Sequence, residues 1–430
     1  MGDVIEIKDK FLSLFDLFGK EYTPVKISSY YTILGSLYNE VVINYSHIST
    51  DLRISQFVPI GPGRGKDEIS TVIKRSYLCY GGGYSEPISY HAEDLIGKVV
   101  PTQVGKGTIR YDTIPGYFNE EYLIFNEATD LLMDPKHENS RKYMRKALDE
   151  YGKNEIMKKG VNVPKEHMMT YFPKTVLTLF FQPFPVPAVN IMTGLFRRVM
   201  IPYIEVKPSH KALYFRISNE ENTGRLSPYW SDWFSFLLTA KNHLQALKKS
   251  GISLEKDIEI TNDEAQYISQ CVVDIIDRSY KRQPITHDYI ESCRFVIQNW
   301  LFKMSTINAL SRNSLKVVDE DVKEAFTDLK TVWDCQMDFV ESWIDWKGYK
   351  SVNLRGQREQ QILTWLSSQG YSEDNPIERG SLIIWIMENY KVSEPRAIQL
   401  INDLITDNYI YKLKTDEDKR KVFYGVDTKK

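Results

Sequence analysis

Apolar residues in the first part of the chain recur at intervals of three and four positions, with polar residues between them. Residues 4–37 carry this pattern, which predicts two amphipathic helices interrupted near Pro24. We therefore expect residues 1–50 to form a helical lead-in to the rest of the chain. The apolar positions that define the two helices are Phe11, Leu14, Phe15, Phe18, Tyr30, Ile33, Leu34 and Leu37.

Short runs of β-forming residues, separated by glycine and proline, replace the helical period from residue 54 onward. Helical stretches at residues 68–79 and 140–151 alternate with these runs. Strands that alternate with helices are typical of a parallel sheet covered by helices. The pattern therefore predicts an α/β fold with a parallel-sheet core at residues 51–206. The predicted strands are residues 54–60, 99–104, 122–126, 176–181 and 199–206.

The periodicity of residues 230–346 is almost wholly helical and predicts a helical bundle. A polar stretch at residues 350–357 then leads to helical segments and two short strands joined by a charged turn. This order is typical of a winged helix, a variant of the helix-turn-helix, and is equally consistent with a protein-docking bundle. The predicted elements are helices 234–247, 263–280, 289–310, 320–343, 358–369, 377–390 and 394–407, and strands 409–413 and 422–426.

The charge balance limits what this architecture can bind. The chain has 55 basic and 57 acidic residues and a formal net charge of -2, which excludes a globally cationic coat for nucleic acid. Any surface for nucleic acid must therefore be local. Residues 136–165 supply a candidate, because they contain nine lysines and arginines against four acidic residues.

Hydropathy and cysteine usage indicate the compartment. The longest apolar runs, such as residues 176–181 and 382–387, are far shorter than the ~20 residues that a bilayer span requires. The four cysteines form no CxxC pair, so we expect neither a structural zinc site nor a disulfide framework. The sequence predicts a soluble, cytoplasmic protein that does not enter a membrane.

A glycine-rich segment at residues 57–67 lies between a predicted strand and a predicted helix, where a phosphate-binding loop belongs. Glycines let backbone N–H groups turn toward a phosphate, the helix N-terminus adds its dipole, and Lys66 reaches the β and γ phosphates. The match to GxxxxGK[ST] is imperfect, because Ile60 replaces the first glycine and Asp67 replaces the Mg²⁺-binding hydroxyl residue. A plain glycine-rich turn is the alternative. The candidate nucleotide ligands are Gly61, Pro62, Gly63, Arg64, Gly65, Lys66 and Asp67.

Later strands end in polar residues that complement this loop. The strand predicted at 122–126 ends in Asn126 and Glu127, where a Walker B motif places a metal-binding Asp and a Glu that orients the attacking water. The following strand ends in Gln182, an amide suited to sensing the γ-phosphate. Arg197 is a candidate finger that acts on the phosphate of a neighbouring subunit. The alternatives are a buried strand that ends at a capped helix, and a surface salt bridge.

The order of these segments resembles the AAA+ ATPases and, within them, the MCM family of replicative DNA helicases. The resemblance covers residues 25–345. It implies an AAA+ parallel-sheet core at residues 51–206, a helical lid at 207–346 and a C-terminal winged helix at 347–430. The pieces that align with the family's phosphate loop, Walker B strand, sensor-one Asn-Pro and arginine finger are residues 62–66, 124–128, 182–183 and 195–198.

The resemblance also implies a cofactor, a partner and roles for the candidate residues. It implies that ATP and Mg²⁺ bind, with Asp67 and Asn126 around the metal and Glu127 against the attacking water. It further implies a homo-oligomeric, hexameric ring that acts on single-stranded or double-stranded DNA. In this ring, Arg197 would reach across from the adjacent subunit.

A DNA-tracking hairpin is the last feature that the resemblance implies. Residues 156–161 occupy its position, which makes Lys158 and Lys159 the candidate contacts with the DNA backbone. An ordinary basic hairpin is the alternative. Because only about fifty residues precede the loop and no cysteine cluster is present, we expect no counterpart of the family's N-terminal oligonucleotide-binding domain and zinc element in residues 1–430. The sensor-two position carries Asp288.

The leading hypothesis is therefore an MCM-like, ATP-dependent DNA helicase or translocase, a replication protein of a virus, plasmid or integrated element. The alternative is a nucleotide-gated replication initiator or loader, which keeps a degenerate ATPase site as a switch and binds DNA through the winged helix. A catalytically inactive assembly subunit that binds no nucleotide is the third hypothesis.

Overall fold

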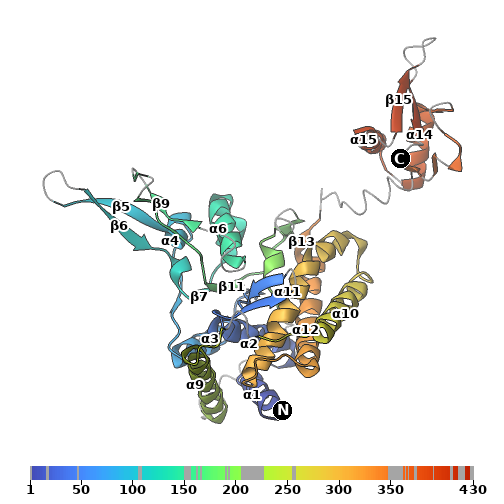
Figure 1. Cartoon of the computed structure of the whole chain (residues 1–430). Coiled ribbons are helices and arrows are strands. Elements are labelled where there is room, and N and C mark those ends of the chain that lie inside the picture. The colour runs from blue at the N-terminus through green and yellow to red at the C-terminus, as the bar shows by residue number, and fades with distance from the viewer. Residues whose placement is uncertain are drawn as a thin grey trace. The chain divides into compact units, whose positions relative to one another are not determined.

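The structure, a computed structural model of the whole chain, divides into two compact units, Met1–Lys347 and Gly348–Lys430 (Figure 1). None of the helices in its described part has the length and apolar content that a bilayer crossing requires. The described residues are 2–15, 19–45, 48–104, 109–149, 156–160, 163–164, 167–188, 191, 194–204, 227–253, 258–346, 362–363, 365–366, 368–371, 375–390, 392–406, 410–414 and 422–426.

The first unit is mixed α/β and is built around a parallel sheet. Across this sheet the strands are β3 (Gln56–Pro59), β11 (Val176–Phe181), β7 (Tyr122–Phe125) and β4 (Tyr84–Ser85). Every residue of β3, β7 and β11 is buried, as expected for a parallel sheet with both faces covered. Beyond β3, Met200 forms a single parallel bridge with Gln56. The strand predicted at 199–206 is therefore wrong for residues 199–204, which form this bridge and no longer ladder.

The first unit contains the following helices around this sheet and beside its outer strands (Figure 1). They are α1 (Gly2–Ser13), α2 (Thr23–Leu37), α3 (Lys66–Cys79), α4 (Ala92–Ile96), α5 (Thr129–Met133), α6 (Glu138–Leu148), α9 (Ser227–Lys249), α10 (Asn262–Ser279), α11 (His287–Ser311) and α12 (Asp319–Trp343). Helices α10, α11 and α12 pack against one another, whereas α9 packs against α1 and α3. The single bundle predicted for residues 230–346 is therefore divided. The reason is Trp233 of α9, whose ring lies 4.5 Å from that of Phe11 in α1 and whose Nε1 donates to Ser76 Oγ in α3 at 2.9 Å.

Helix α2 belongs to the core, which corrects the predicted helical lead-in at residues 1–50. All its residues from Pro24 onward are buried, and it packs against β3, α11 and α12. Two of its serines bond to the sheet instead of facing water: Ser28 Oγ donates to Gln56 Oε1 at 2.5 Å, and Gln56 Nε2 donates to Ser29 Oγ at 3.0 Å. The helix is therefore not amphipathic. Strands β1 (Val42–Tyr45) and β2 (Ile48–Asp51) follow it as an antiparallel hairpin.

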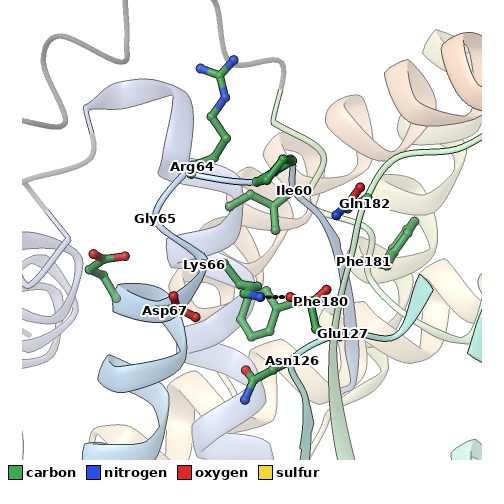
Figure 2. Close-up of a pocket in the computed structure, with 14 residues that line it drawn as sticks. Ile60, Arg64, Gly65, Lys66, Asp67, Asn126, Glu127, Phe180, Phe181 and Gln182 are labelled. Atoms are coloured by element: carbon green, nitrogen blue, oxygen red, sulfur yellow. Dashed lines mark hydrogen bonds and ion pairs between the residues drawn. The ribbon is translucent and has the colours of Figure 1, made fainter. Parts of the chain in front are cut away.

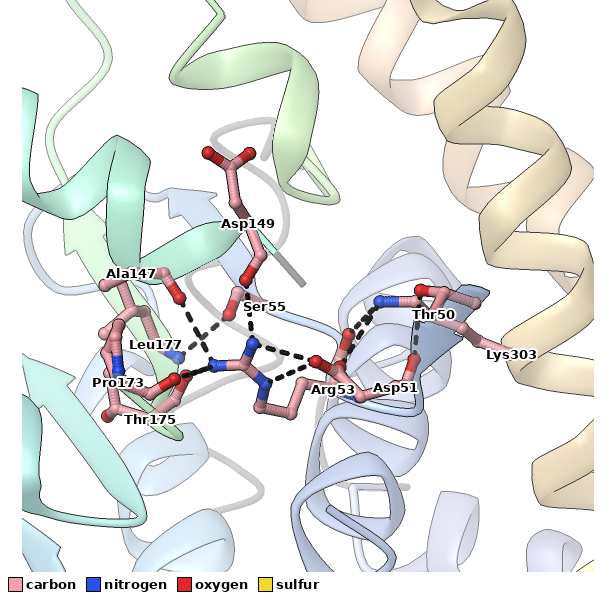
Figure 3. Close-up of polar contacts among 10 residues, drawn as sticks. All are labelled: Thr50, Asp51, Arg53, Ser55, Ala147, Asp149, Pro173, Thr175, Leu177 and Lys303. Atoms are coloured by element: carbon pink, nitrogen blue, oxygen red, sulfur yellow. Dashed lines mark hydrogen bonds and ion pairs between the residues drawn. The ribbon is translucent and has the colours of Figure 1, made fainter. Parts of the chain in front are cut away.

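A buried arginine joins β2 to α6 and to the start of β11 (Figure 3). The guanidinium of Arg53 donates to the Asp51 carboxylate at 2.8 and 3.1 Å. Lys303 of α11 donates to the Arg53 carbonyl oxygen at 2.8 Å. The other acceptors of the Arg53 guanidinium lie at both ends of the segment between α6 and β11. This one positive charge therefore holds the two ends of the segment together. These acceptors are the carbonyl oxygens of Ala147, Asp149, Pro173 and Thr175.

Two further antiparallel strand pairs lie outside the central sheet. Strand β5 (Gly97–Gln103) pairs antiparallel with β6 (Ile109–Pro115) and parallel with β9 (Lys159–Gly160), and β8 (Ile156–Met157) pairs antiparallel with β10 (Thr170–Tyr171). The strand predicted at 99–104 is thus confirmed, but it lies outside the parallel sheet. Tyr111 of β6 stacks on His167 with ring centroids 4.2 Å apart. Strand β12 (Val186–Pro187) pairs parallel with β13 (Ile344–Asp345), just after α12.

Short 3₁₀ turns complete the first unit. They are η2 (Lys20–Tyr22), η3 (Tyr117–Asn119), η4 (Pro135–His137), η6 (Phe196–Arg198) and η7 (Pro284–Thr286). Of these, η6 carries the predicted arginine finger. It follows Gly194, whose backbone has φ of 94°.

The second unit has a hydrophobic core of its own. Its elements are helical residues 362–363, 365–366 and 368, β14 (Ile377–Glu378), α14 (Arg379–Tyr390), α15 (Glu394–Thr406), β15 (Ile410–Lys414) and β16 (Val422–Val426). The three strands form an antiparallel sheet in the order β14–β16–β15. The helix predicted at 377–390 begins only at Arg379, because β14 pairs with β16. The predicted charged turn at 415–421 lies outside the described residues.

Candidate functional site

The glycine-rich segment forms the turn between β3 and α3 (Figure 2). Gly63 and Gly65 have φ of 65° and 83°, a left-handed conformation that glycine adopts without steric cost. Helix α3 begins at Lys66. The turn borders a cavity of about 190 Å³ whose far side is formed by the residues after β7 and β11. The predicted site residues that line this cavity are Gly61, Pro62, Gly63, Arg64, Gly65, Lys66, Asp67, Asn126, Glu127 and Gln182.

The backbone of this turn has unused hydrogen-bond donors. Within the described part of the chain, the N–H groups of Gly63, Gly65, Lys66 and Asp67 make no hydrogen bond. Free N–H groups at the start of a helix, together with its dipole, attract an anion. The turn therefore fits a phosphate group.

Lys66 and Glu127 meet inside the cavity. Lys66 Nζ forms an ion pair with Glu127 Oε1, drawn as a dashed line in Figure 2. The carboxylate is 65% exposed, so a ligand entering the cavity can reach it. The two residues follow strands on either side of β11, and the carboxyl ends of parallel strands open at one edge of the sheet. The sheet thus brings together the two residues to which the sequence analysis assigned phosphate binding and water activation.

Asn126 is held from two sides by residues that the sequence analysis missed. Ser70 Oγ of α3 donates to Asn126 Oδ1 at 3.1 Å, and Asn126 Nδ2 donates to Glu86 Oε2. Glu86 also pairs with Lys74 Nζ at 2.7 Å. Glu86 directly follows β4, a strand of two residues that comes after three glycines and carries no apolar run. The hydrophobic pattern therefore gave no signal for it.

Gln182 and Tyr22 complete the surroundings of the turn. Gln182 follows β11, between the ends of β3 and β7, and its backbone N–H donates to Thr129 Oγ1 at 2.9 Å. Tyr22 was not predicted as a site residue, yet its hydroxyl donates to the Arg64 carbonyl oxygen at 2.9 Å. Burial, with a smaller contribution from Glu21, raises the pKa of Tyr22 to about 12, so the hydroxyl stays protonated and fixes the turn.

The residues predicted to hold a metal fit Mg²⁺ only in part. Asp67 is exposed at the first turn of α3, and its carboxylate has no partner in the described part of the chain. Asn126 offers an amide oxygen that already accepts from Ser70. No group of three or more His, Cys, Asp or Glu gathers as a metal site among the described residues. Because Mg²⁺ commonly binds through one or two protein oxygens, water and substrate phosphates, this sparse set is compatible with a nucleotide-bound ion.

Arg197 lies away from the turn. It lines a second cavity, of about 280 Å³, which shares no lining residue with the first. Its neighbour Arg198 donates to Asp149 Oδ1 at 2.6 Å and to the Gly194 carbonyl oxygen at 2.7 Å. Arg197 itself has no hydrogen bond or ion pair in the described part of the chain. The structure therefore separates Arg197 from the predicted nucleotide residues of the same chain.

The structure shows the surroundings of Lys158, whose predicted DNA contact stays a prediction. This residue lies between β8 and β9, is only 6% exposed, and its ammonium sits 5.5 Å from the centre of the Tyr171 ring. Burial lowers the pKa of Lys158. In this conformation the Lys158 ammonium packs on Tyr171 and is largely covered. The side chain of Lys159 lies outside the described residues, so its predicted DNA contact stays a prediction.

The basic segment at residues 136–165 is only partly available for binding. Arg141 donates to the carbonyl oxygens of Leu131 and Asp134, both at 2.9 Å, and Lys136 pairs with Asp134 at 2.7 Å. These charges stabilise the turn before α6. Lys142 on α6 is exposed.

Comparison with known proteins identifies no relative of this chain. No protein-family model matches the chain, and no curated protein matches its sequence.

Proposed function

We propose that the chain is a divergent AAA+ ATPase similar to the MCM helicases, and that it works as an ATP-dependent DNA helicase or translocase in a hexameric ring. The observation that carries the proposal is the meeting of Lys66 and Glu127 in a cavity bordered by free backbone N–H groups. The parallel sheet also supports the proposal. Gln182 follows β11, the strand that lies between β3 and β7.

The geometry suggests how the residues act on a nucleotide. A phosphate chain on the turn takes Lys66 as its counter-ion and releases Glu127, whose exposed carboxylate then accepts a proton from the attacking water. Asp67 and Asn126 are the residues that would hold Mg²⁺, which, when bound, neutralises phosphate charge. Arg197, which makes no hydrogen bond or ion pair with the described residues of its own chain, is available to a neighbouring subunit.

DNA binding is proposed for the second unit. Its three helical segments and three-stranded antiparallel sheet match the outline of a winged helix, in which one helix enters the major groove. Within the first unit, Lys159 remains the proposed contact with a single strand.

A second candidate function is a nucleotide-gated initiator or loader. It is favoured by the burial of Lys158, by Asn126 in place of the metal-binding Asp, and by Asp67 in place of the hydroxyl residue. Such a protein would bind ATP at the turn as a switch and bind DNA through the second unit.

ATP hydrolysis by the full chain, measured with and without single-stranded DNA, tests the proposal. Hydrolysis that DNA stimulates supports the translocase, and binding of ATP without turnover supports the initiator. A full chain that binds no nucleotide at millimolar concentration would contradict both.

A further inference from the structure

The residue after β4 faces the residue after β7 at the edge of the sheet where the nucleotide is proposed to bind. Strands β4 and β7 are parallel neighbours with Ser85 opposite Leu123, and the side chain of Glu86 reaches that of Asn126. Asn126 Nδ2 donates to Glu86 Oε2, and Lys74 Nζ of α3 forms an ion pair with the same oxygen at 2.7 Å. The Glu86 side chain is 38% exposed, and the Lys74 side chain 23%.

This contact decides which way the amide of Asn126 points. An amide has one end that donates and one that accepts, whereas an ionised carboxylate only accepts. Glu86 therefore selects the NH₂ group of Asn126 and leaves the oxygen on the side of Ser70 and the turn. With the amide reversed, two acceptor oxygens would face each other. The oxygen is the end of the amide that suits Mg²⁺.

We propose that Glu86 is a positioning residue of the nucleotide site, which fixes the Asn126 amide with its oxygen toward α3 and makes Asn, rather than Asp, the residue that fits after β7. This inference rests on the proposed function. It also identifies Glu86 as the residue on which the choice of Asn at position 126 depends. An Asp at position 126 would place a second carboxylate directly against Glu86, and like charges at hydrogen-bond distance cannot both ionise without cost.

Two explanations of Asn126 can therefore be separated. In the first, the metal site needs a single carboxylate. Asp67 supplies it, so position 126 carries the neutral Asn instead of Asp. In the second, which the geometry supports, Asn126 is set by Glu86. The first predicts that Asn126→Asp is rescued by Asp67→Ser, and the second that it is rescued by Glu86→Gln, because Gln can donate to the new carboxylate.

The first experiment measures the thermal unfolding midpoint of the full chain at pH 7 without nucleotide. Asn126→Asp should lower the midpoint by several degrees, and adding Glu86→Gln should restore most of the loss, whereas adding Asp67→Ser should not. Glu120→Gln is the matched control: this exposed glutamate lies just before β7, has no side-chain partner in the described part of the chain, and should leave the midpoint unchanged. An unchanged midpoint in Asn126→Asp, or rescue by Asp67→Ser alone, overturns the proposal.

The second experiment measures the Mg²⁺ dependence of ATP binding. A residue with only a structural role would leave this dependence unchanged. Outer-shell partners typically change metal affinity by about 10–100-fold. Glu86→Gln should therefore weaken the Mg²⁺ dependence of ATP binding by about tenfold or more, and Glu86→Asp, still an acceptor only, should retain more of it. Equal Mg²⁺ dependence in wild type and Glu86→Gln overturns this role. If the wild type binds no nucleotide, the proposed function fails, while the unfolding midpoints still decide whether Glu86 and Asn126 form a coupled pair.

Discussion

Lys66 and Glu127 lie 61 positions apart in the chain and form an ion pair at the mouth of one cavity. Each residue neutralises the other in this structure, and each has a different proposed task once a nucleotide is present. A phosphate that replaces Glu127 as the partner of Lys66 leaves the carboxylate free for water. Under the proposed function, this one contact couples phosphate binding to the activation of Glu127.

Replacing the lysine should remove nucleotide binding. Arg64 and Lys66 are the basic residues among the described residues that line the cavity. Lys66→Ala removes the one of them that forms the ion pair with Glu127. We expect ATP affinity to fall below detection in a fluorescence titration with a labelled nucleotide. Lys142→Ala, which removes an exposed lysine on α6, should bind as wild type does. Unchanged affinity in Lys66→Ala would remove the phosphate-loop assignment.

Replacing the glutamate should separate binding from hydrolysis. Glu127→Gln keeps an oxygen and the side-chain length but cannot accept a proton as a carboxylate does. ATP should bind at least as tightly as in wild type, since Lys66 loses its competing ion pair, and turnover should fall by about 10²–10⁴-fold. The measurement is phosphate release at saturating ATP. Retained turnover would place the catalytic carboxylate elsewhere.

The two neighbouring lysines after β8 should behave differently toward DNA. Lys159→Ala should reduce the slope of log affinity against log salt for single-stranded DNA by ~0.7, the loss of one phosphate contact. Lys158→Ala should leave this slope unchanged, because the Lys158 ammonium is buried over Tyr171. Its loss should instead lower stability by up to about 2 kcal/mol, the contribution of a desolvated cation–π contact. Equal flattening by both variants would show that Lys158 leaves its buried position when DNA binds.

Removing the guanidinium of Arg53 should destabilise the first unit strongly. Arg53→Met leaves Asp51, only 2% exposed, without its closest cation, and leaves the carbonyl oxygens at both ends of the α6–β11 segment without their donor. Breaking a buried pair in this way costs about 3–5 kcal/mol. Urea unfolding of the full chain measures the loss. Arg110→Met, at a side chain that is 72% exposed, is the control and should change stability by less than about 0.5 kcal/mol.

Tyr22 should contribute to a loss of stability in alkali. Burial raises its pKa to about 12 in the folded chain, whereas an unfolded tyrosine titrates near 10. Between these values the folded state binds the proton and the unfolded state does not, so the free energy of unfolding falls as pH rises above about 10. Urea midpoints measured from pH 8 to 11 should therefore fall less steeply in Tyr22→Phe than in wild type. Parallel profiles for the two proteins would contradict this pKa.

The sequence by itself determined the local elements of the site. The apolar runs at β3, β7 and β11, and the strand-turn-helix around Lys66, are readable because burial on both faces of a strand and the backbone freedom of glycine leave their marks on adjacent residues. The polar residues that end these strands were visible for the same reason. Their occurrence at one edge followed from the parallel sheet that the alternation predicted.

Only the tertiary structure decided which of these residues meet and which charges are buried. The strand order β3–β11–β7–β4 pairs segments distant in sequence, so the pairing of Glu86 with Asn126 has no local signature, and β4 is too short to show a period. Lys158 looks like a solvent-exposed lysine in sequence, because its burial depends on Tyr171 of the opposite strand. The predicted polar face of helix α2 is buried instead, with Gln56 as the hydrogen-bond partner of Ser28 and Ser29. In each case the polar side chain is placed by a hydrogen bond or an aromatic ring from a segment distant in sequence. The residues adjacent to it in the sequence do not reveal that contact.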